Sequence, residues 1–375
     1  MNINFGKWIS FILAILTVCL CFPVSIYAQN QAADISARCA YAYIPEIDAV
    51  VFEKNADVRR PMASTTKIMT AVVVLENTEP DDIVSVPREA VGIEGSSVYL
   101  RENDEFTVQD LLYALLLQSA NDAAAALAIS IGGSIEGFAK MMNEKAQELS
   151  LFDTHFTNPH GLDNEEHYTT AKDLARLSAY ALGNQDFKNI VSTHKKTFSS
   201  LDGECVRTVV NHNKMLLLYE GATGVKTGFT KKSGRCLVSS ADKNGMTVIA
   251  VTLDAPSDWH DHRLLLDMSY SEYEKRVFAN ELEFEISLPV INGEKQSLLC
   301  ANKSKLSAIV EKSSNEATLS LDLPHTLIAP INEGDILGYI HYKIDGEIVS
   351  SSPVIAKETI KEIKYKKGIL GSVRN

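Results

Sequence analysis

The sequence has few cysteines, no metal-binding spacing and more acidic than basic residues, and each of these features excludes a class of protein. Six cysteines in 375 residues do not make the disulfide framework of a small secreted domain. No C-x-x-C pair occurs and His260-Asp261-His262 is too short and isolated for a closed zinc site, so we expect no metal and no other cofactor. The 36 Lys and Arg residues face 48 Asp and Glu residues, and the net charge of −12 argues against nucleic acid as a partner.

The only long apolar run lies at the N-terminus. It extends from Trp8 to Phe22, after the lone charge Lys7 and before the small residue Ala28. This pattern predicts a signal peptide over residues 1–28 and an exported protein that acts outside the cytoplasm, in the cell wall or on the outer face of the cytoplasmic membrane. A retained membrane anchor is the alternative, because the run approaches the roughly 20 apolar residues that a spanning helix needs.

The C-terminal residues 357–375 form a basic tail with six basic and two acidic residues. Its apolar residues are few, and a charge signal without a large apolar face binds a bilayer weakly. We therefore expect a solvated tail, with weak contact to an anionic membrane surface at most.

Hydrophobic periodicity divides the remaining chain into two domains. Residues 29–278 mix strands with helices, which indicates an α/β domain in which an antiparallel sheet is covered by helices. The predicted strands form a hairpin over 38–54 and a three-strand meander over 222–230, 235–241 and 246–254. Helices are expected over 65–76, 108–117, 123–131, 135–149, 170–182 and 258–278.

Residues 279–356 show the alternation of strands that bury one face, as in Leu282 to Leu288 and Leu319 to Leu323. Asp345-Gly346 is typical of a hairpin turn. This region is predicted to be a small all-β domain, and it carries no recognisable chemistry.

Ser64 and Lys67 are the first candidate reactive pair. They lie three residues apart at the predicted start of a helix, on one face. A serine needs a base to become a nucleophile, and a lysine serves only if its pKa falls. Lowering it from about 10.4 to about 7.5 requires roughly 4 kcal/mol, which burial and a second lysine could supply.

Two further motifs follow in the chain. Ser119-Ala120-Asn121 lies at a predicted helix junction, and Lys226-Thr227-Gly228 lies in a predicted strand. Each motif alone is weak: S-x-x-K also occurs at Ser192 and Ser240, and a lone serine before a helix is usually only a cap. Their order and structural context therefore carry the prediction.

This ordered set resembles the motifs of penicillin-binding proteins, in particular the low-molecular-mass D-alanyl-D-alanine carboxypeptidases. The resemblance covers about residues 35–275 strongly and the β-domain in outline. It implies a penicillin-binding/β-lactamase-like fold with a helical subdomain beside the sheet. The segments that carry it are Pro61–Thr70, Leu117–Ala124, Asn158–Leu162 and Gly224–Gly228.

The resemblance also implies roles for the reacting groups. Ser64 would attack the carbonyl between two terminal D-alanines of a peptidoglycan stem peptide, and Lys67 would take its proton. Ser119 would pass a proton to the leaving amine, and Asn121 would hold the substrate amide or Lys67. β-Lactam antibiotics would then be covalent inhibitors.

The remaining implied residues bind substrate. Lys226 and Thr227 would bind the terminal carboxylate, with help from Arg263. Gly228 would let the substrate backbone lie close to the strand, and the backbone amides of Ser64 and Phe229 would form the oxyanion hole. Asn158 to Leu162 is interpreted as a structural turn.

Three alternatives remain open. A D,D-endopeptidase of the same fold would cut cross-links rather than trim stem peptides. A class A β-lactamase would need a glutamate that activates the deacylating water, and no E-x-x-L-N segment occurs. A non-catalytic cell-wall-binding protein could retain the fold, although all three motifs are intact.

Overall fold

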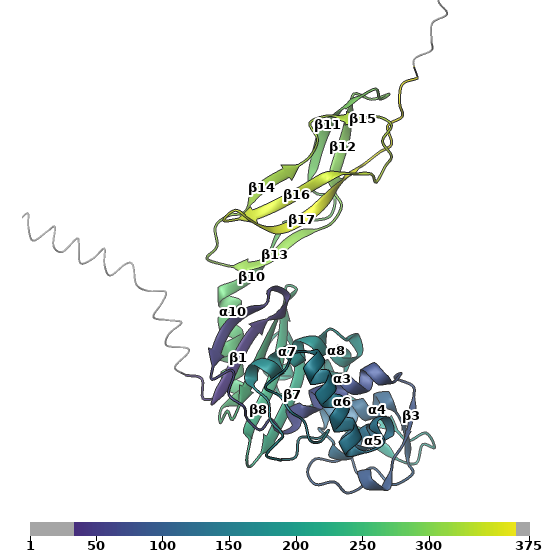
Figure 1. Cartoon of the computed structure of the whole chain (residues 1–375), viewed down its shortest axis with the longest axis vertical. Helices are drawn as coiled ribbons and strands as arrows, with labels where there is room; N and C mark the ends of the chain where they lie inside the picture. The colour runs from purple at the N-terminus through teal and green to yellow at the C-terminus, as the bar shows by residue number, and fades with distance from the viewer. Residues whose placement is uncertain (1–33, 365–375) are drawn as a thin grey trace, which may run out of the picture. The chain divides into compact units, whose positions relative to one another are not determined.

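The computed structural model describes residues 34–364, which form two compact units that divide between Tyr270 and Ser271 (Figure 1). Each unit has its own hydrophobic core. The predicted signal peptide and residues 365–375 of the basic tail lie outside the described residues. Within residues 34–364, none of the helices has both the length and the apolar character to cross a membrane.

A five-stranded antiparallel sheet lies at the centre of the first unit, in the order β2-β1-β9-β8-β7. The predicted hairpin and meander are both present, and the pairing of β1 with β9 joins them into one sheet. β7 is an edge strand, which leaves one of its sides without a strand partner among the described residues. The strands are β1 (Cys39–Ile44), β2 (Ala49–Lys54), β7 (Ala222–Thr230), β8 (Gly234–Lys243) and β9 (Met246–Leu253).

Helices cover both faces of this sheet. Ser239 of β8 and Thr252 of β9 point to one face, where both hydrogen-bond the buried His262 of α10. Because side chains alternate along a strand, their neighbours Val238 and Val251 point to the other face, into the core shared with α7 and α8. The covering helices are α7 (Ala171–Leu182), α8 (Gln185–Ser192) and α10 (Asp258–Glu272).

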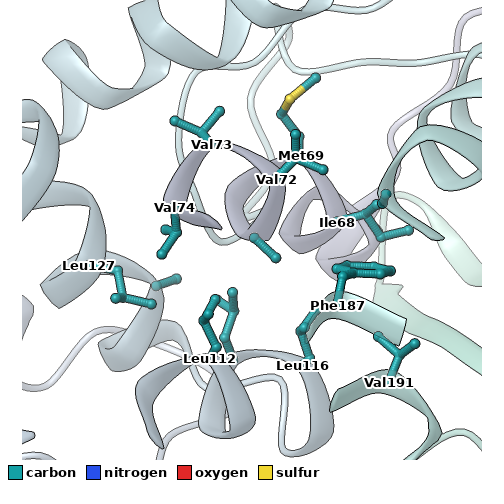
Figure 2. Close-up of a cluster of buried hydrophobic side chains, with 14 of the residues drawn as sticks. Ile68, Met69, Val72, Val73, Val74, Leu112, Leu116, Leu127, Phe187 and Val191 are labelled. Carbon is teal, nitrogen blue, oxygen red and sulfur yellow. The ribbon is translucent and has the colours of Figure 1, made fainter. Parts of the chain in front are cut away.

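A helical subdomain surrounds α3 beside the sheet, as the resemblance implied. Figure 2 shows the buried apolar side chains of α3 meeting Leu112 and Leu116 of α4, Leu127 of α5 and Phe187 of α8. Burying each such side chain stabilises the fold by about 1.5–3 kcal/mol, so α3 is held firmly from several sides. The subdomain helices are α3 (Lys67–Asn77), α4 (Val108–Leu117), α5 (Asn121–Gly132) and α6 (Ile135–Glu148).

Shorter elements complete the first unit. The Thr107 hydroxyl accepts a hydrogen bond from the Asp110 amide at 3.1 Å and so caps the N-terminus of α4. Two small hairpins and several single turns connect the helices. They are β3 (Ile83–Ser85) with β4 (Glu105–Thr107), β5 (Lys195–Ser199) with β6 (Val206–Val210), η1 (Pro45–Ile47), η2 (Ala63–Thr66), η3 (Arg88–Ala90) and α9 (Met215–Leu218).

The helix predicted over 258–278 is too long. α10 ends at Glu272, and β10 (Tyr273–Ala279) pairs antiparallel with β13 (Leu306–Glu311). The side chains of residues 273–279 are compatible with either structure, and pairing with β13, which lies later in the chain, decides for the strand. Because the two units divide between Tyr270 and Ser271, β10 belongs to the second unit.

The second unit is an all-β domain, as predicted. Its six-stranded sheet has the order β14-β16-β17-β12-β11-β15 and packs a small core around Leu298, Cys300, Ile340 and Val354. Asp345 and Gly346 both have positive φ angles, of 52° and 91°, in the tight turn between β16 and β17. The strands are β11 (Glu285–Ile291), β12 (Ser297–Asn302), β14 (Thr318–Asp322), β15 (Leu327–Ile328), β16 (Ile336–Ile344) and β17 (Glu347–Ala356).

Candidate active site

Ser64 lies in the 3-10 turn η2 that leads directly into α3. The two neighbouring hydroxyls are committed to the turn, because Thr65 Oγ1 donates to Met62 O at 2.7 Å and Thr66 Oγ1 donates to Ala63 O at 2.8 Å. Both threonines are fully buried, whereas Ser64 is half-buried. The turn therefore presents the Ser64 hydroxyl and hides the other two.

Lys67 is the first residue of α3 and is completely buried. Its Nζ lies 3.1 Å from Ser64 Oγ, 2.7 Å from Asn121 Oδ1 and 2.6 Å from the main-chain oxygen of His160. Burial, reinforced by the positive charge of Lys226, lowers the pKa of Lys67 well below its ordinary value, and Asp122 opposes this only in part. A lysine with such a pKa is suited to act as a base.

Ser119 and Asn121 reach the same place from the junction of α4 and α5. Ser119 is nearly buried and has a φ angle of +62°, and α5 begins at Asn121 without a side-chain cap. Ser119 is therefore not a helix cap, which was the alternative reading of its sequence. The Asn121 amide bridges Lys67 and the loop before α4, since its Nδ2 donates to Glu94 O at 2.5 Å.

The third motif lies on the edge strand β7. Lys226 is buried, its Nζ donates to Thr227 O at 2.9 Å, and burial lowers its pKa to about 7. Gly228 lies against η2, because a Cβ there would be 3.0 Å from Ser64 N and 3.0 Å from Met62 O. Phe229 follows with 65 % of its surface exposed. Only glycine allows β7 to approach the turn so closely.

A cavity of about 310 Å³ opens where these segments meet. Five of the predicted residues line it, namely Ser64, Ser119, Thr227, Gly228 and Phe229. Lys67 is joined to Ser64 by a hydrogen bond, and Asn121 is joined in turn to Lys67. A larger cavity of about 550 Å³ lies among α3, α7 and α8 and contains none of the predicted site residues, so we place the chemistry in the smaller one.

The structure does not bring Arg263 to this cavity. Its side chain is exposed on α10, with Nη2 3.5 Å from His260 Nδ1. Arg235 lines the cavity instead, in an ion pair of 2.8 Å with Asp258 and with its guanidinium over the Trp259 ring at 5.7 Å. The reason is the sheet register, since residue 235 pairs directly with Phe229 beside the third motif.

Sequence reasoning missed Arg235 and also His212, Ser96, Asp258 and Trp259, which line the same cavity. The position of Arg235 could have been predicted from the meander, because an antiparallel turn after Thr230 brings residue 235 opposite Phe229. His212 and Ser96 come from loops whose positions depend on distant contacts.

The segment from Asn158 to Leu162 is a turn, as predicted, and it also contributes to the site. Asn158 Oδ1 accepts a hydrogen bond from Gly161 N at 2.7 Å, which closes the turn. The turn directs the His160 carbonyl at Lys67, as described above. Its contribution is thus a main-chain oxygen that no side-chain motif could reveal.

A half-buried serine in contact with a buried lysine, beside an edge strand that carries a second buried lysine, is the arrangement of a serine hydrolase of the penicillin-binding fold. The sequence profile of the D-alanyl-D-alanine carboxypeptidase family matches residues 27–257, and that of the C-terminal domain of penicillin-binding protein 5 matches residues 277–362. The chain belongs to the D-alanyl-D-alanine carboxypeptidase family, among the low-molecular-mass penicillin-binding proteins. The resemblance noted from the motifs is confirmed.

Individual relatives agree with this assignment over both units. The chain is 31 % identical to the D-alanyl-D-alanine carboxypeptidase DacF of Bacillus subtilis over 92 % of each chain. It is 30 % identical to DacC of Escherichia coli over 91 % of this chain and 89 % of the relative. The crystal structure of DacD from Francisella tularensis is similar with a TM-score of 0.63 and 26 % identity, over 88 % of this chain and 95 % of that one.

Proposed function

We propose that this protein removes the terminal D-alanine from peptidoglycan stem pentapeptides through an acyl-enzyme on Ser64. The observation that carries the proposal is the environment of Lys67. A neutral amine has two N–H donors and one lone pair, and two carbonyl oxygens, of Asn121 and His160, lie within 2.7 Å of its nitrogen. With both donors engaged, the lone pair is left to accept the hydrogen of Ser64 Oγ at 3.1 Å.

Burial favours the neutral form of that amine, because it lowers the pKa of Lys67 well below its ordinary value. A charged ammonium has three donors and no acceptor, so it could not take a proton from Ser64. The nearby Lys226 disfavours the charge further. The two lysines have separate roles in this proposal: Lys67 is the base, and Lys226, with a pKa of about 7, takes up its charge beside the carboxylate of the substrate.

The cationic end of the cavity suits the terminal carboxylate of a peptide. Lys226 and Thr227 lie on β7, and Arg235 lies on the adjacent strand with its side chain partly exposed. Arg235 replaces Arg263 in the proposal, because only Arg235 lines the cavity. An arginine and a carboxylate form charge-assisted hydrogen bonds, which are among the stronger polar interactions.

The reaction would then run in two steps. Ser64 Oγ attacks the carbonyl carbon of the penultimate D-alanine while its proton moves to Lys67, and the backbone amides of Ser64 and Phe229 receive the developing negative charge. The C–N bond breaks as Ser119 passes a proton to the leaving amine, and D-alanine departs. Water then cleaves the ester and restores Ser64. A penicillin would be attacked in the same way and would remain attached for longer.

Release of D-alanine tests this proposal. The substrate is diacetyl-L-Lys-D-Ala-D-Ala, and the protein lacking residues 1–28 is compared with its Ser64→Ala variant. We expect release from the unmodified protein and none from the variant. Release by both would exclude Ser64 as the nucleophile.

Release by neither protein would lead to the endopeptidase or the binding-protein alternative. Cross-linked muropeptides distinguish these two, since only the endopeptidase shortens them. Labelled penicillin adds a separate measure, because rapid turnover of the drug would indicate a β-lactamase.

We also propose that the protein is exported through residues 1–28 and acts outside the cytoplasmic membrane, where the stem peptides are. The test is fractionation of cells that express the full chain. For the tail at 357–375, we expect little sedimentation with phosphatidylglycerol vesicles, and loss of what there is at high salt.

A further inference from the structure

His167 is a buried histidine that joins two segments of the site. One is the turn η2, called the nucleophile turn here because it carries Ser64, and the other is the loop from Thr157 to Leu162, which faces Lys67. His167 is only 3 % exposed. The backbone amide of Thr157 donates to its Nδ1 at 3.0 Å, and Thr66 Oγ1 lies 2.7 Å from its Nε2. A backbone amide can only donate, so Nδ1 is the acceptor and the neutral ring carries its hydrogen on Nε2. His167 therefore donates to Thr66.

The hydrogen bonds continue from Thr66 to the residue before the nucleophile. Thr66 Oγ1 donates to Ala63 O at 2.8 Å, and Ala63 has a φ angle of +49°, which a residue with a Cβ rarely adopts. Such a conformation persists only where surrounding contacts stabilise it. The series of hydrogen bonds from Thr157 through His167 and Thr66 to Ala63 provides some of these contacts.

The loop at the other end of this series of hydrogen bonds contacts Lys67. It begins at Thr157 and carries the His160 carbonyl that accepts from Lys67 Nζ. It also packs tightly on the nucleophile turn, since a Cβ on Gly161 would lie 2.0 Å from Ala63 O and 2.9 Å from Thr66 Oγ1. A shift of the loop would therefore move the turn and the carbonyl together.

We propose that His167 is a positioning residue for acylation, which holds the nucleophile turn through Thr66 while the amide of Thr157, at the start of the loop that carries the His160 carbonyl, fixes its ring. Burial lowers the pKa of His167 to about 4, so the neutral ring, whose Nδ1 accepts from Thr157 N and whose Nε2 donates to Thr66, persists across the neutral range. The inference rests on the proposed function, because it takes Ser64 as the acylated residue.

Two amide substitutions separate the two hydrogen bonds of the ring. In His167→Asn, Oδ1 takes the place of Nδ1 and can still accept from Thr157 N, while the donor to Thr66 is lost. In His167→Gln, Nε2 takes the place of the ring Nε2 and can still donate to Thr66. The rate of acylation by labelled penicillin, per folded enzyme, is measured for both. We expect about a tenfold or larger loss in the asparagine variant and about threefold or less in the glutamine variant.

Thr66 provides a second, independent pair of variants if the histidine variants fold poorly. Thr66→Val removes the hydroxyl and should slow acylation, whereas Thr66→Ser keeps it and should not. Combining Thr66→Val with His167→Asn should be no slower than the slower single variant, because both interrupt the same chain of hydrogen bonds.

His155→Gln is the matched control. His155 lies on the same segment and its Nδ1 contacts Glu166 O, but its ring has no hydrogen bond to the nucleophile turn. We expect its acylation rate to match that of the unmodified protein.

Equal acylation rates in His167→Asn and the unmodified protein, or equal losses in the asparagine and glutamine variants, would overturn the inference. A lowered melting temperature with an unchanged rate would show a structural role only. Failure of the unmodified protein itself to acylate would instead remove the proposed function, so the two failures are distinguishable.

Discussion

Replacing Asn121 by aspartate would place a second charge beside the general base. Asn121 Oδ1 is 2.7 Å from Lys67 Nζ, and both side chains are buried. At an effective dielectric constant of about 20, unit charges at this distance attract by about 6 kcal/mol, which equals about 4 pKa units. Even a third of that energy would raise the pKa of Lys67 by more than one unit. The lysine would then stay charged, and therefore inactive as a base, up to a higher pH.

The assay is the rate constant of acylation at saturating labelled penicillin, from about pH 5 to about pH 10. At saturation all of the enzyme has bound the drug, so the titration of Lys226 no longer affects binding. The acid limb of the pH–rate profile then reports the protonation of Lys67. We expect Asn121→Asp to move that limb upward by at least about one pH unit, to lower the neutral rate about tenfold or more, and to recover at high pH.

Asn121→Ala is the control for the lost amide contacts. It removes the partner of Lys67 and the hydrogen bond to Glu94 O without adding charge. It should lower the rate at every pH and leave the limb at or below its original position. The reasoning is refuted if Asn121→Asp lowers the rate by the same factor at every pH.

Three further predictions concern other residues of the first unit. Arg235→Met should raise KM for the D-alanyl peptide about tenfold or more with little change in kcat, because a hydrogen bond to a charged group contributes about 1.5–3 kcal/mol; an unchanged KM would exclude Arg235 from carboxylate binding. Gly228→Ala should slow acylation about tenfold or more, because its methyl would lie 3.0 Å from Ser64 N, and a normal rate in a stopped-flow measurement would contradict this contact. His262 has its pKa lowered to about 3 by burial, while the unfolded chain binds that proton near 6.5, so stability should fall as the pH drops below 6.5, by up to about 1.4 kcal/mol per pH unit. His262→Gln should flatten this fall in urea unfolding, and an equal slope in both proteins would contradict it.

The reactive residues could be predicted because short motifs keep them together in the chain. Ser64 and Lys67 are adjacent on one turn, and Lys226, Thr227 and Gly228 are consecutive on one strand. The strand meander was predictable for the same local reason. The end of α10 was not, because the residues from Tyr273 onward form a strand only through their distant partner β13.

Residues that act through a main-chain atom or from another strand could not be predicted. The contribution of His160 is a carbonyl oxygen, which has no sequence signature. Arg235 enters the cavity through the register of β7 with β8, and Arg263 is excluded because it lies on the exposed side of α10. His167 gave no signal at all, since both its partners are ordinary threonines from other segments.

The sequence by itself determined the chemistry of this protein, because a nucleophile, a base and a carboxylate-binding cation are properties of residue types at short spacing. The tertiary structure alone decided that the pKa of Lys67 falls well below its ordinary value, because that fall comes from burial among the helices around α3 and from the approach of Lys226. It also decided which arginine lines the cavity. Both outcomes depend on desolvation and sheet register, which arise only when segments far apart in the chain come together.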